Sequence, residues 1–165
     1  MFEVWIIWGL AAASLASGLV AGVFLSFSDF VIRSLVAAEP AAGTRAMQHI
    51  NREVYRTVFL TLLLGLVPVS VLILVYGVTM QGGAVAALLI GAAGLYLLGG
   101  FGVTALGNVP MNRRLDAMAL GGSEARAYWP AYASRWTRWN HIRALAAFGA
   151  SLGYLVAALL LQGGG

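Results

Sequence analysis

Four long apolar segments separated by polar connections dominate the hydrophobic pattern of the chain. They cover residues 4–31, 57–80, 84–107 and 139–161. A helix of about 20 residues crosses the hydrocarbon core of a bilayer, so each segment is long enough to span it. The pattern predicts an all-α fold, an integral membrane four-helix bundle that forms one domain over residues 1–165. Because Glu3 stands where a secretory signal would be basic, we expect the first segment to be retained.

The first and third connections have a mixed polar and apolar pattern. Residues 37–56 and 113–135 are each predicted to contain short amphipathic helices, the second one interrupted near Gly121 and at Pro130. The first of these helices either lies on the bilayer surface or turns Asn51 inward, and the pattern fits both arrangements.

The third apolar segment ends in a proline motif, Asn108-Val109-Pro110-Met111-Asn112. Proline disfavours helical backbone at the residue before it, so we expect a bend at Val109. The two flanking asparagines either satisfy the backbone groups that such a bend frees or contact a ligand.

Composition and charge exclude several classes of protein. The chain is 61% hydrophobic and 10% charged, with a mean hydropathy of +0.86, which is far from a soluble domain. Without cysteine it has no disulfide, thiol nucleophile or thiolate metal site. All ten cationic residues are arginines, and they lie in the first and third connections and at the start of the last apolar segment. The positive-inside rule therefore predicts that these two connections are cytoplasmic and that both termini lie outside. We expect a bacterial inner membrane protein without a nucleic-acid partner.

The start of the fourth segment places three functional groups on one helix face. Trp136, Asn140 and Arg143 stand at i, i+4 and i+7, and small residues continue the same stripe towards the C-terminus. Asp29 lies near the end of the first segment, and an ionisable residue there requires a partner. Arg33 and Arg143 are the two candidates.

The predicted topology brings these polar residues to one side of the membrane. We expect either a structural ion pair with packed amides or a pocket for a flat, oxygenated aromatic molecule. The polar residues of that pocket would be Asp29, Asn51, Asn108, Asn112, Asn140 and Arg143. Its walls would be Phe24, Phe27, Tyr55, Trp136 and Trp139. A haem or a metal held by His49 and His141 is a weaker alternative, since neither histidine lies in a ligand-spaced motif.

Four motifs resemble those of a known family. They are Gly22–Val31, Met47–Asn51, Phe101–Asn112 with its Asn-Val-Pro-x-Asn piece, and Arg135–Arg143 with its Trp-Asn-x-x-Arg piece. In these motifs the chain resembles the DUF1772, or anthrone oxygenase-like, family of four-helix membrane proteins. The resemblance implies oxidation of an anthrone to an anthraquinone by molecular oxygen without an established cofactor.

If that activity transfers, the residues acquire specific roles. A base, Asp29 or His141, would remove a benzylic proton, and Arg143 with Asn140 would stabilise the resulting oxyanion. The substrate would be bound by Phe27, Asn51, Asn108, Asn112, Trp136 and Trp139. The expected partners are a hydrophobic aromatic molecule, molecular oxygen and membrane lipids, with no cofactor or metal. The alternative is a non-catalytic accessory subunit or a lipid-, quinone- or haem-binding protein, and both a homo-oligomer and a larger membrane complex are compatible with the pattern.

Overall fold

The computed structural model describes residues 2–163, and most of them are helical. Its α-helices are α1 (Phe2–Ser26), α2 (Ile32–Ala37), α3 (Pro40–Glu53), α4 (Val58–Met80), α5 (Gly83–Gly94), α6 (Val109–Asp116) and α7 (Ser123–Gly163). Three π-helical turns, η1 (Phe27–Val31), η3 (Leu95–Gly102) and η4 (Thr104–Asn108), and the 3-10 turn η2 (Val54–Arg56) connect some of them.

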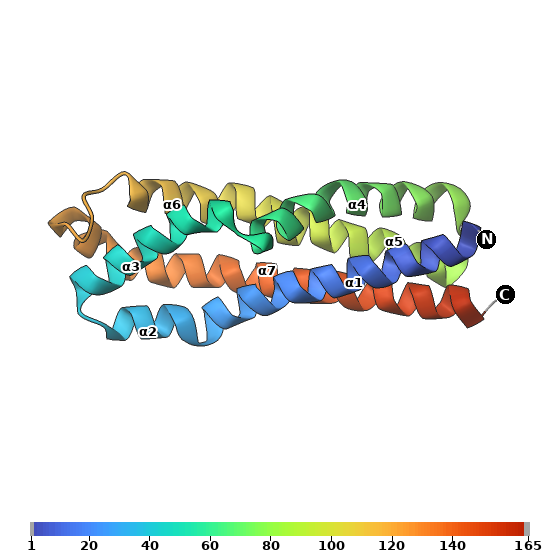
Figure 1. The fold of residues 1–165 in the computed structure, drawn as a ribbon, viewed down its shortest axis with the longest axis horizontal. Coiled ribbons are helices and arrows are strands. Elements are labelled where there is room, and N and C mark those ends of the chain that lie inside the picture. The colour runs from blue at the N-terminus through green and yellow to red at the C-terminus, as the bar shows by residue number, and fades with distance from the viewer. Residues whose placement is uncertain (1, 164–165) are drawn as a thin grey trace.

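These elements join into four long helices. Glu3–Ala37, Val58–Met80, Gly83–Asp116 and Ser123–Gly163 are each long and apolar enough to cross a membrane. Figure 1 shows both ends of the chain and the α4–α5 turn at one end of the molecule, with α2, α3 and α6 towards the other. The predicted all-α fold with four apolar helices is therefore confirmed.

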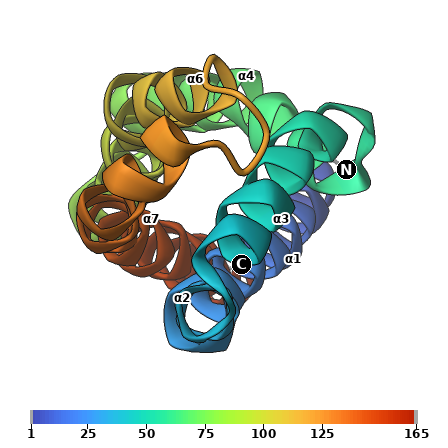
Figure 2. The ribbon, with the colours of Figure 1, turned by 90° about the vertical axis from the view of Figure 1, so that its left-hand side faces the viewer.

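Helix α7 is packed against α1 along much of its length and also contacts α5, and the four long helices surround a common axis (Figure 2). Small residues permit this proximity. The Oγ of Ser14 donates to the carbonyl of Ser151, and the Oγ of Ser151 donates to the carbonyl of Ser14. A Cβ at Gly153 would lie 2.7 Å from the Cβ of Ala92, closer than real side chains approach. The predicted small-residue stripe on α7 is thus a helix contact surface.

The bend that we expected at Val109 is absent, so this prediction is wrong. Val109 has helical backbone angles, φ −62° and ψ −45°, and α6 follows η4 directly. Pro110 lacks an N–H, and its ring would clash with the preceding turn of a regular α-helix. The wider π-helical turn at Thr104–Asn108 accommodates the proline, so the third long helix continues to Asp116.

The predicted interruption at Pro130 is also wrong, because α7 continues through it. Pro130 is exposed, so the backbone groups freed by the proline can be solvated. The chain reverses instead at residues 117–122, where Gly121 has a positive φ of 62°. Glycine adopts that left-handed conformation at little steric cost.

Helix α3 is part of the bundle rather than a helix lying apart from it. Gln48 is fully buried, and its Nε2 donates to the carbonyls of Leu115 and Met118 while its Oε1 accepts from the backbone N–H of Gly121. At the start of α3 the Glu39 carboxylate accepts from the N–H groups of Ala41 and Ala42, which lowers the pKa of Glu39. Of the two arrangements considered for this helix, the structure has the one with Asn51 turned inward.

Candidate functional site

A small pocket of about 90 Å³ lies where the end of α1 meets α3, α4, α6 and α7. We call it the Arg143 pocket. Its inner end is formed by buried residues: Phe24, Met47, Asn51, Trp136, Asn140 and Arg143. Its rim is formed by half-buried ones: Val23, Phe27, Ile50, Val54, Phe59 and Asn112. A cavity of about 150 Å³ holds one benzene molecule. The Arg143 pocket is smaller than that, so it can receive only the edge of a larger ring system.

Arg143 is the most unusual residue of the pocket, because only 6% of its surface is exposed. Its Nη1 donates to the Oγ1 of Thr104 at 3.4 Å, and its Nη2 donates to the Oδ1 of Asn140. The guanidinium lies over the ring of Phe24, 4.2 Å from its centroid, and 5.2 Å from that of Trp136. Its buried Nε has no hydrogen-bond partner.

No carboxylate among residues 2–163 forms an ion pair with this buried cation. Across residues 2–163 the one ion pair joins Arg33 to Asp29, with 2.9 Å between Nη2 and Oδ1, and both side chains are mostly exposed. Of the two partners considered for Asp29, the structure therefore selects Arg33. A desolvated guanidinium without a counter-ion attracts an anion or an electron-rich oxygen.

The hydrogen-bond partners fix the orientation of the pocket amides. Asn140 must direct its Oδ1 to Arg143, since a guanidinium only donates, and its Nδ2 donates to the carbonyl of Phe24 and the Oγ of Ser28 at 2.5 and 2.6 Å. These bonds use the whole Asn140 amide and attach α7 to the end of α1.

Asn51 and Asn112 each keep one free polar atom. The Oδ1 of Asn112 accepts from the Tyr132 hydroxyl at 2.8 Å and from the Trp136 Nε1 at 2.9 Å. The Nδ2 of Asn51 donates to the Asp116 carboxylate at 3.3 Å. Within the described part of the chain, the Nδ2 of Asn112 and the Oδ1 of Asn51 remain unbonded. The pocket thus offers a cation, an amide donor and an amide acceptor.

Aromatic rings form the rest of the wall. Phe27 lies 5.8 Å from Trp136 between ring centroids, and Phe24 meets Phe59 edge to face at 5.5 Å. Behind Trp136, Tyr132 and Trp129 continue a stacked series along α7. These contacts hold the rings at the separations that aromatic pairs prefer.

The structure therefore brings together six of the ten predicted site residues. They are Phe27, Asn51, Asn112, Trp136, Asn140 and Arg143. Asn108 is fully buried behind the pocket, where its Nδ2 donates to the carbonyl of Trp136 and its Oδ1 has no partner. Trp139 is 42% exposed and packs over Gly107 on an outer face of α7. Tyr55, expected in the wall, is 66% exposed.

Asp29 and His141, the two predicted bases, lie together on the other side of the end of α1. They line an open hollow of about 1,040 Å³ between α1–α2 and α7, which we call the lateral groove. Ser28 also lines this groove, so its hydrogen bond to Asn140 separates the groove from the Arg143 pocket. The π-helical turn η1 places Phe27 in the pocket and Ser28 and Asp29 in the groove.

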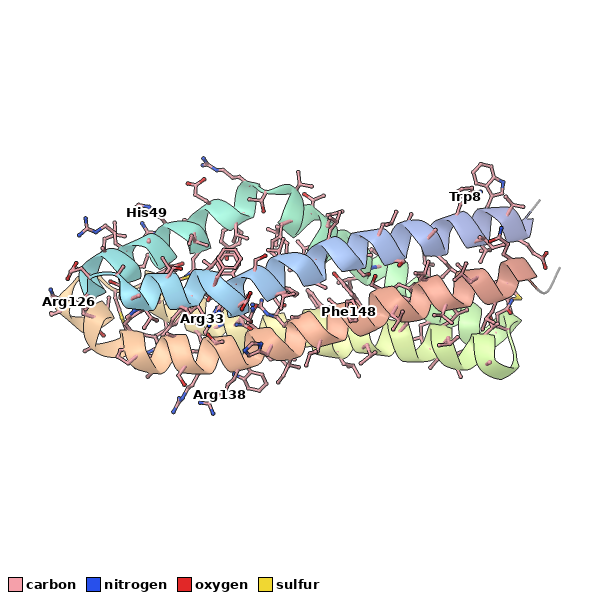
Figure 3. The ribbon with its side chains drawn as sticks, turned by 90° about the horizontal axis from the view of Figure 1, so that it is seen from below. Trp8, Arg33, His49, Arg126, Arg138 and Phe148 are labelled. Atoms are coloured by element: carbon pink, nitrogen blue, oxygen red, sulfur yellow. The ribbon has the colours of Figure 1, made fainter. Side chains whose placement is uncertain are left out.

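The two histidines are not brought together. His49 is exposed on the side of α3 that points away from α7, whereas His141 lies in the lateral groove (Figure 3). Among residues 2–163 no three histidine, aspartate or glutamate side chains are grouped so that they could hold a metal ion.

Sequence reasoning missed several residues that shape the pocket. Thr104 binds the Arg143 guanidinium, Ser28 binds Asn140, and Asp116 holds the Asn51 amide. Serine and threonine carry no signal of their own in an apolar helix, where they commonly bond to their own backbone. Asp116 was detectable in principle, because it follows the asparagine motif by four residues.

One of three comparisons with known proteins found a match. The sequence profile of one family, described as anthrone oxygenase, matches residues 52–153, more than half of the chain. The match includes Asn112, Trp136, Asn140 and Arg143 of the pocket. Neither the comparison with curated proteins nor the one with solved structures found a match. On the profile match the chain belongs to the anthrone oxygenase family, whose name indicates a general oxygenase-like role.

Proposed function

We propose that the protein is a membrane-embedded oxygenase that converts a hydroxylated polycyclic aromatic of the anthrone type into the corresponding quinone. One observation carries the proposal: a buried guanidinium without a carboxylate lies over aromatic rings in a pocket with one free amide donor and one free amide acceptor. These groups complement the oxygenated edge of a flat aromatic molecule.

The membrane supplies a hydrophobic substrate at the right depth. About 20 residues of α1 cross the hydrocarbon layer, from near Val4 to near Phe24. The crossing of α7 correspondingly runs from near His141 to near Leu161. Helix α4 begins at Val58, beside Phe59 of the rim. With the arginine-rich end cytoplasmic, the pocket lies at the inner boundary of the hydrocarbon layer. A flat apolar molecule dissolved in the bilayer reaches the rim laterally.

The pocket binds the substrate as its anion. Loss of a benzylic proton from an anthrone places negative charge on the ring carbon and the conjugated oxygen, and Arg143 stabilises that oxygen. The phenolic hydroxyl beside it donates to the Oδ1 of Asn51, and the Nδ2 of Asn112 donates to a substrate oxygen. The oxygenated edge occupies the inner end, and the remaining rings lie against Phe27 and Phe59.

The bound carbanion reduces molecular oxygen directly. One oxygen atom forms a bond to the ring carbon, and the peroxide anion takes a proton from water. The resulting hydroperoxide loses water as its O–O bond and the remaining C–H bond break. The methylene carbon becomes a carbonyl, so one oxygen atom enters the product and the other leaves as water. The substrate supplies all four electrons.

Among the described residues, no histidine or carboxylate lines the Arg143 pocket. We therefore propose that the positive field of Arg143 selects the ionised substrate and that the proton leaves to water at the rim. Asp29 and His141 then have no direct part in the reaction. This differs from the hypothesis in which Asp29 or His141 is the base, and variants of the neighbouring residues Asn140 and His141 distinguish the two.

Oxygen uptake by the purified protein in lipid nanodiscs tests the function. With a hydroxylated anthrone and ¹⁸O₂, we expect consumption of one oxygen molecule per substrate and one labelled atom in the new carbonyl, at a rate well above spontaneous oxidation. A rate equal to that of empty nanodiscs would contradict the proposal.

The same preparation discriminates the alternatives. A Soret band or activity removed by a chelator would favour the haem or metal reading. A stoichiometric protein partner together with an inactive chain would favour an accessory subunit.

A further inference from the structure

The lateral groove continues along the seam between α1 and α7. Leu25 and His141 line its wide part and also a second hollow of about 460 Å³, which is bounded by Gly18, Gly22 and Phe148 among others. Figure 3 views this seam, with Arg33 and Phe148 lying along it and Arg126 near its far end. The two hollows form one elongated depression on the outside of the bundle.

The chemistry of the depression changes along its length. The narrow part from Gly18 to Leu25 is lined by glycine, alanine and large apolar side chains, apart from His141 at its end. The wide part is also lined mainly by apolar residues, among them Ile32, Val36 and Trp129. It differs from the narrow part in containing the charged side chains of Asp29, Arg33 and Arg126 together with serine and threonine hydroxyls. If the hydrocarbon layer ends near Phe24 and His141, the apolar part lies within it and the polar part lies at the level of the headgroups.

We propose that this depression binds one glycerophospholipid of the bilayer. An acyl chain lies in the narrow part against Gly22 and Phe148. The phosphate lies in the wide part, where the guanidinium of Arg126 and the outer face of the paired Arg33 stabilise its charge. The charged residues of the depression, Asp29, Arg33 and Arg126, all lie in its wide part, at the end where such a lipid has its headgroup. This site is separate from the proposed oxygenase site and does not depend on it.

Two features of α1 make room for the acyl chain. A Cβ at Gly22 would meet nothing within 4 Å. Ser14, Gly18 and Gly22 recur every fourth residue along α1. Ser14 and Gly18 contact Ser151 of α7, whereas Gly22 has no such contact. Because Gly22 opens onto the depression, a larger side chain at this position fills the space for the acyl chain without forcing the helices apart.

Native mass spectrometry of the detergent-purified protein, titrated with dioleoyl phosphatidylglycerol after delipidation, tests the proposal. We expect one tightly held lipid per chain and a thermal unfolding midpoint that rises with lipid concentration. Gly22→Leu should weaken lipid retention by about tenfold or more, since each excluded methylene group contributes a factor of several. Gly91→Leu is the matched control, because Gly91 is also exposed and has nothing within 4 Å.

A second pair of variants tests the headgroup end. Arg126→Gln should reduce lipid affinity by about fivefold, whereas Arg138→Gln, an equal charge change on the side of α7 that points away from α1, should not (Figure 3). Equal lipid retention by Gly22→Leu and Gly91→Leu would overturn the proposal. So would displacement of the lipid by a hydroxylated anthrone, which would assign the groove to that molecule, or an effect of inorganic phosphate alone as large as that of the lipid.

Discussion

The Arg143 pocket and the lateral groove lie at the same level of the bundle, on opposite sides of the π-helical turn η1, yet they differ in construction. In the pocket the polar side chains are buried and held by named partners, as Asn140 is by Phe24, Ser28 and Arg143. In the groove, Asp29 and Arg33 bond mainly to each other and are exposed. A fixed set of groups in a small volume suits recognition of one molecular edge, whereas an open amphipathic surface suits a flexible lipid.

Removing the pocket cation should have the largest effect. Arg143→Gln should lower the rate of oxygen consumption by about 10²–10³-fold, the usual cost of losing an oxyanion-stabilising group. The variant should remain folded, because it removes a buried charge that has no carboxylate partner. Arg138→Gln controls for loss of charge. Uptake by Arg143→Gln within tenfold of the parent would exclude the oxyanion role.

The neighbouring residues Asn140 and His141 line the Arg143 pocket and the lateral groove, respectively, so their variants test the two sites directly. Asn140→Leu should lower oxygen uptake by about 100-fold and destabilise the protein by roughly 3 kcal/mol, since it removes the acceptor of the Arg143 Nη2 and the hydrogen bonds to the Phe24 carbonyl and the Ser28 Oγ. His141→Gln, which changes only the groove side, should alter uptake by less than about threefold. Uptake kinetics with thermal unfolding of both variants provide the measurement. A large activity loss in His141→Gln would place the base in the groove.

The pH dependence tests selection of the anion. If the pocket binds the ionised substrate, kcat/KM should rise about tenfold per pH unit below the substrate pKa and level off above it. Two anthrones with different acidities should give profiles displaced by the difference between their pKa values. Profiles that coincide for the two substrates would indicate a titrating protein group instead.

The free acceptor of Asn51 predicts a smaller, substrate-dependent effect. Asn51→Leu should raise KM about tenfold for a substrate with a phenolic hydroxyl beside the ionised oxygen, because that hydroxyl loses its acceptor. Asp116→Asn should have a similar but weaker effect, since Asp116 orients the Asn51 amide. A substrate without the hydroxyl should show no KM change, and an equal change for both substrates would contradict the assignment.

The smallest effect belongs to a contact that neither site uses. Ser14→Ala removes the hydrogen bond from the Ser14 Oγ to the Ser151 carbonyl, and should destabilise the protein by about 1 kcal/mol without altering oxygen uptake or lipid binding. Denaturant titration gives the value. This loss of unfolding free energy is the reference for a variant that affects helix packing alone. A similar loss of stability in Asn51→Leu or His141→Gln would therefore not indicate a functional role.

Much of the pocket could be predicted from helical periodicity. Trp136, Asn140 and Arg143 share a buried face of α7 because a regular helix preserves the i, i+4, i+7 relation. The same reasoning predicted the wrong side of α1 for Asp29. The π-helical turn η1 contains one residue more than an α-helical turn, so it rotates the side chains that follow about the helix axis. Asn108 faces inward as expected but supports the backbone of Trp136 rather than lining the pocket.

The sequence by itself determined the four long apolar helices, the small-residue stripe of α7 and the set of polar residues gathered at one end, since these depend on local composition and period. Only the tertiary structure decided which polar groups meet. The side of α1 on which Phe27 and Asp29 emerge depends on the π-helical turn, and the inward position of Asn51 depends on hydrogen bonds from Gln48 to residues about 70 positions away. Such contacts join groups that no short sequence window contains.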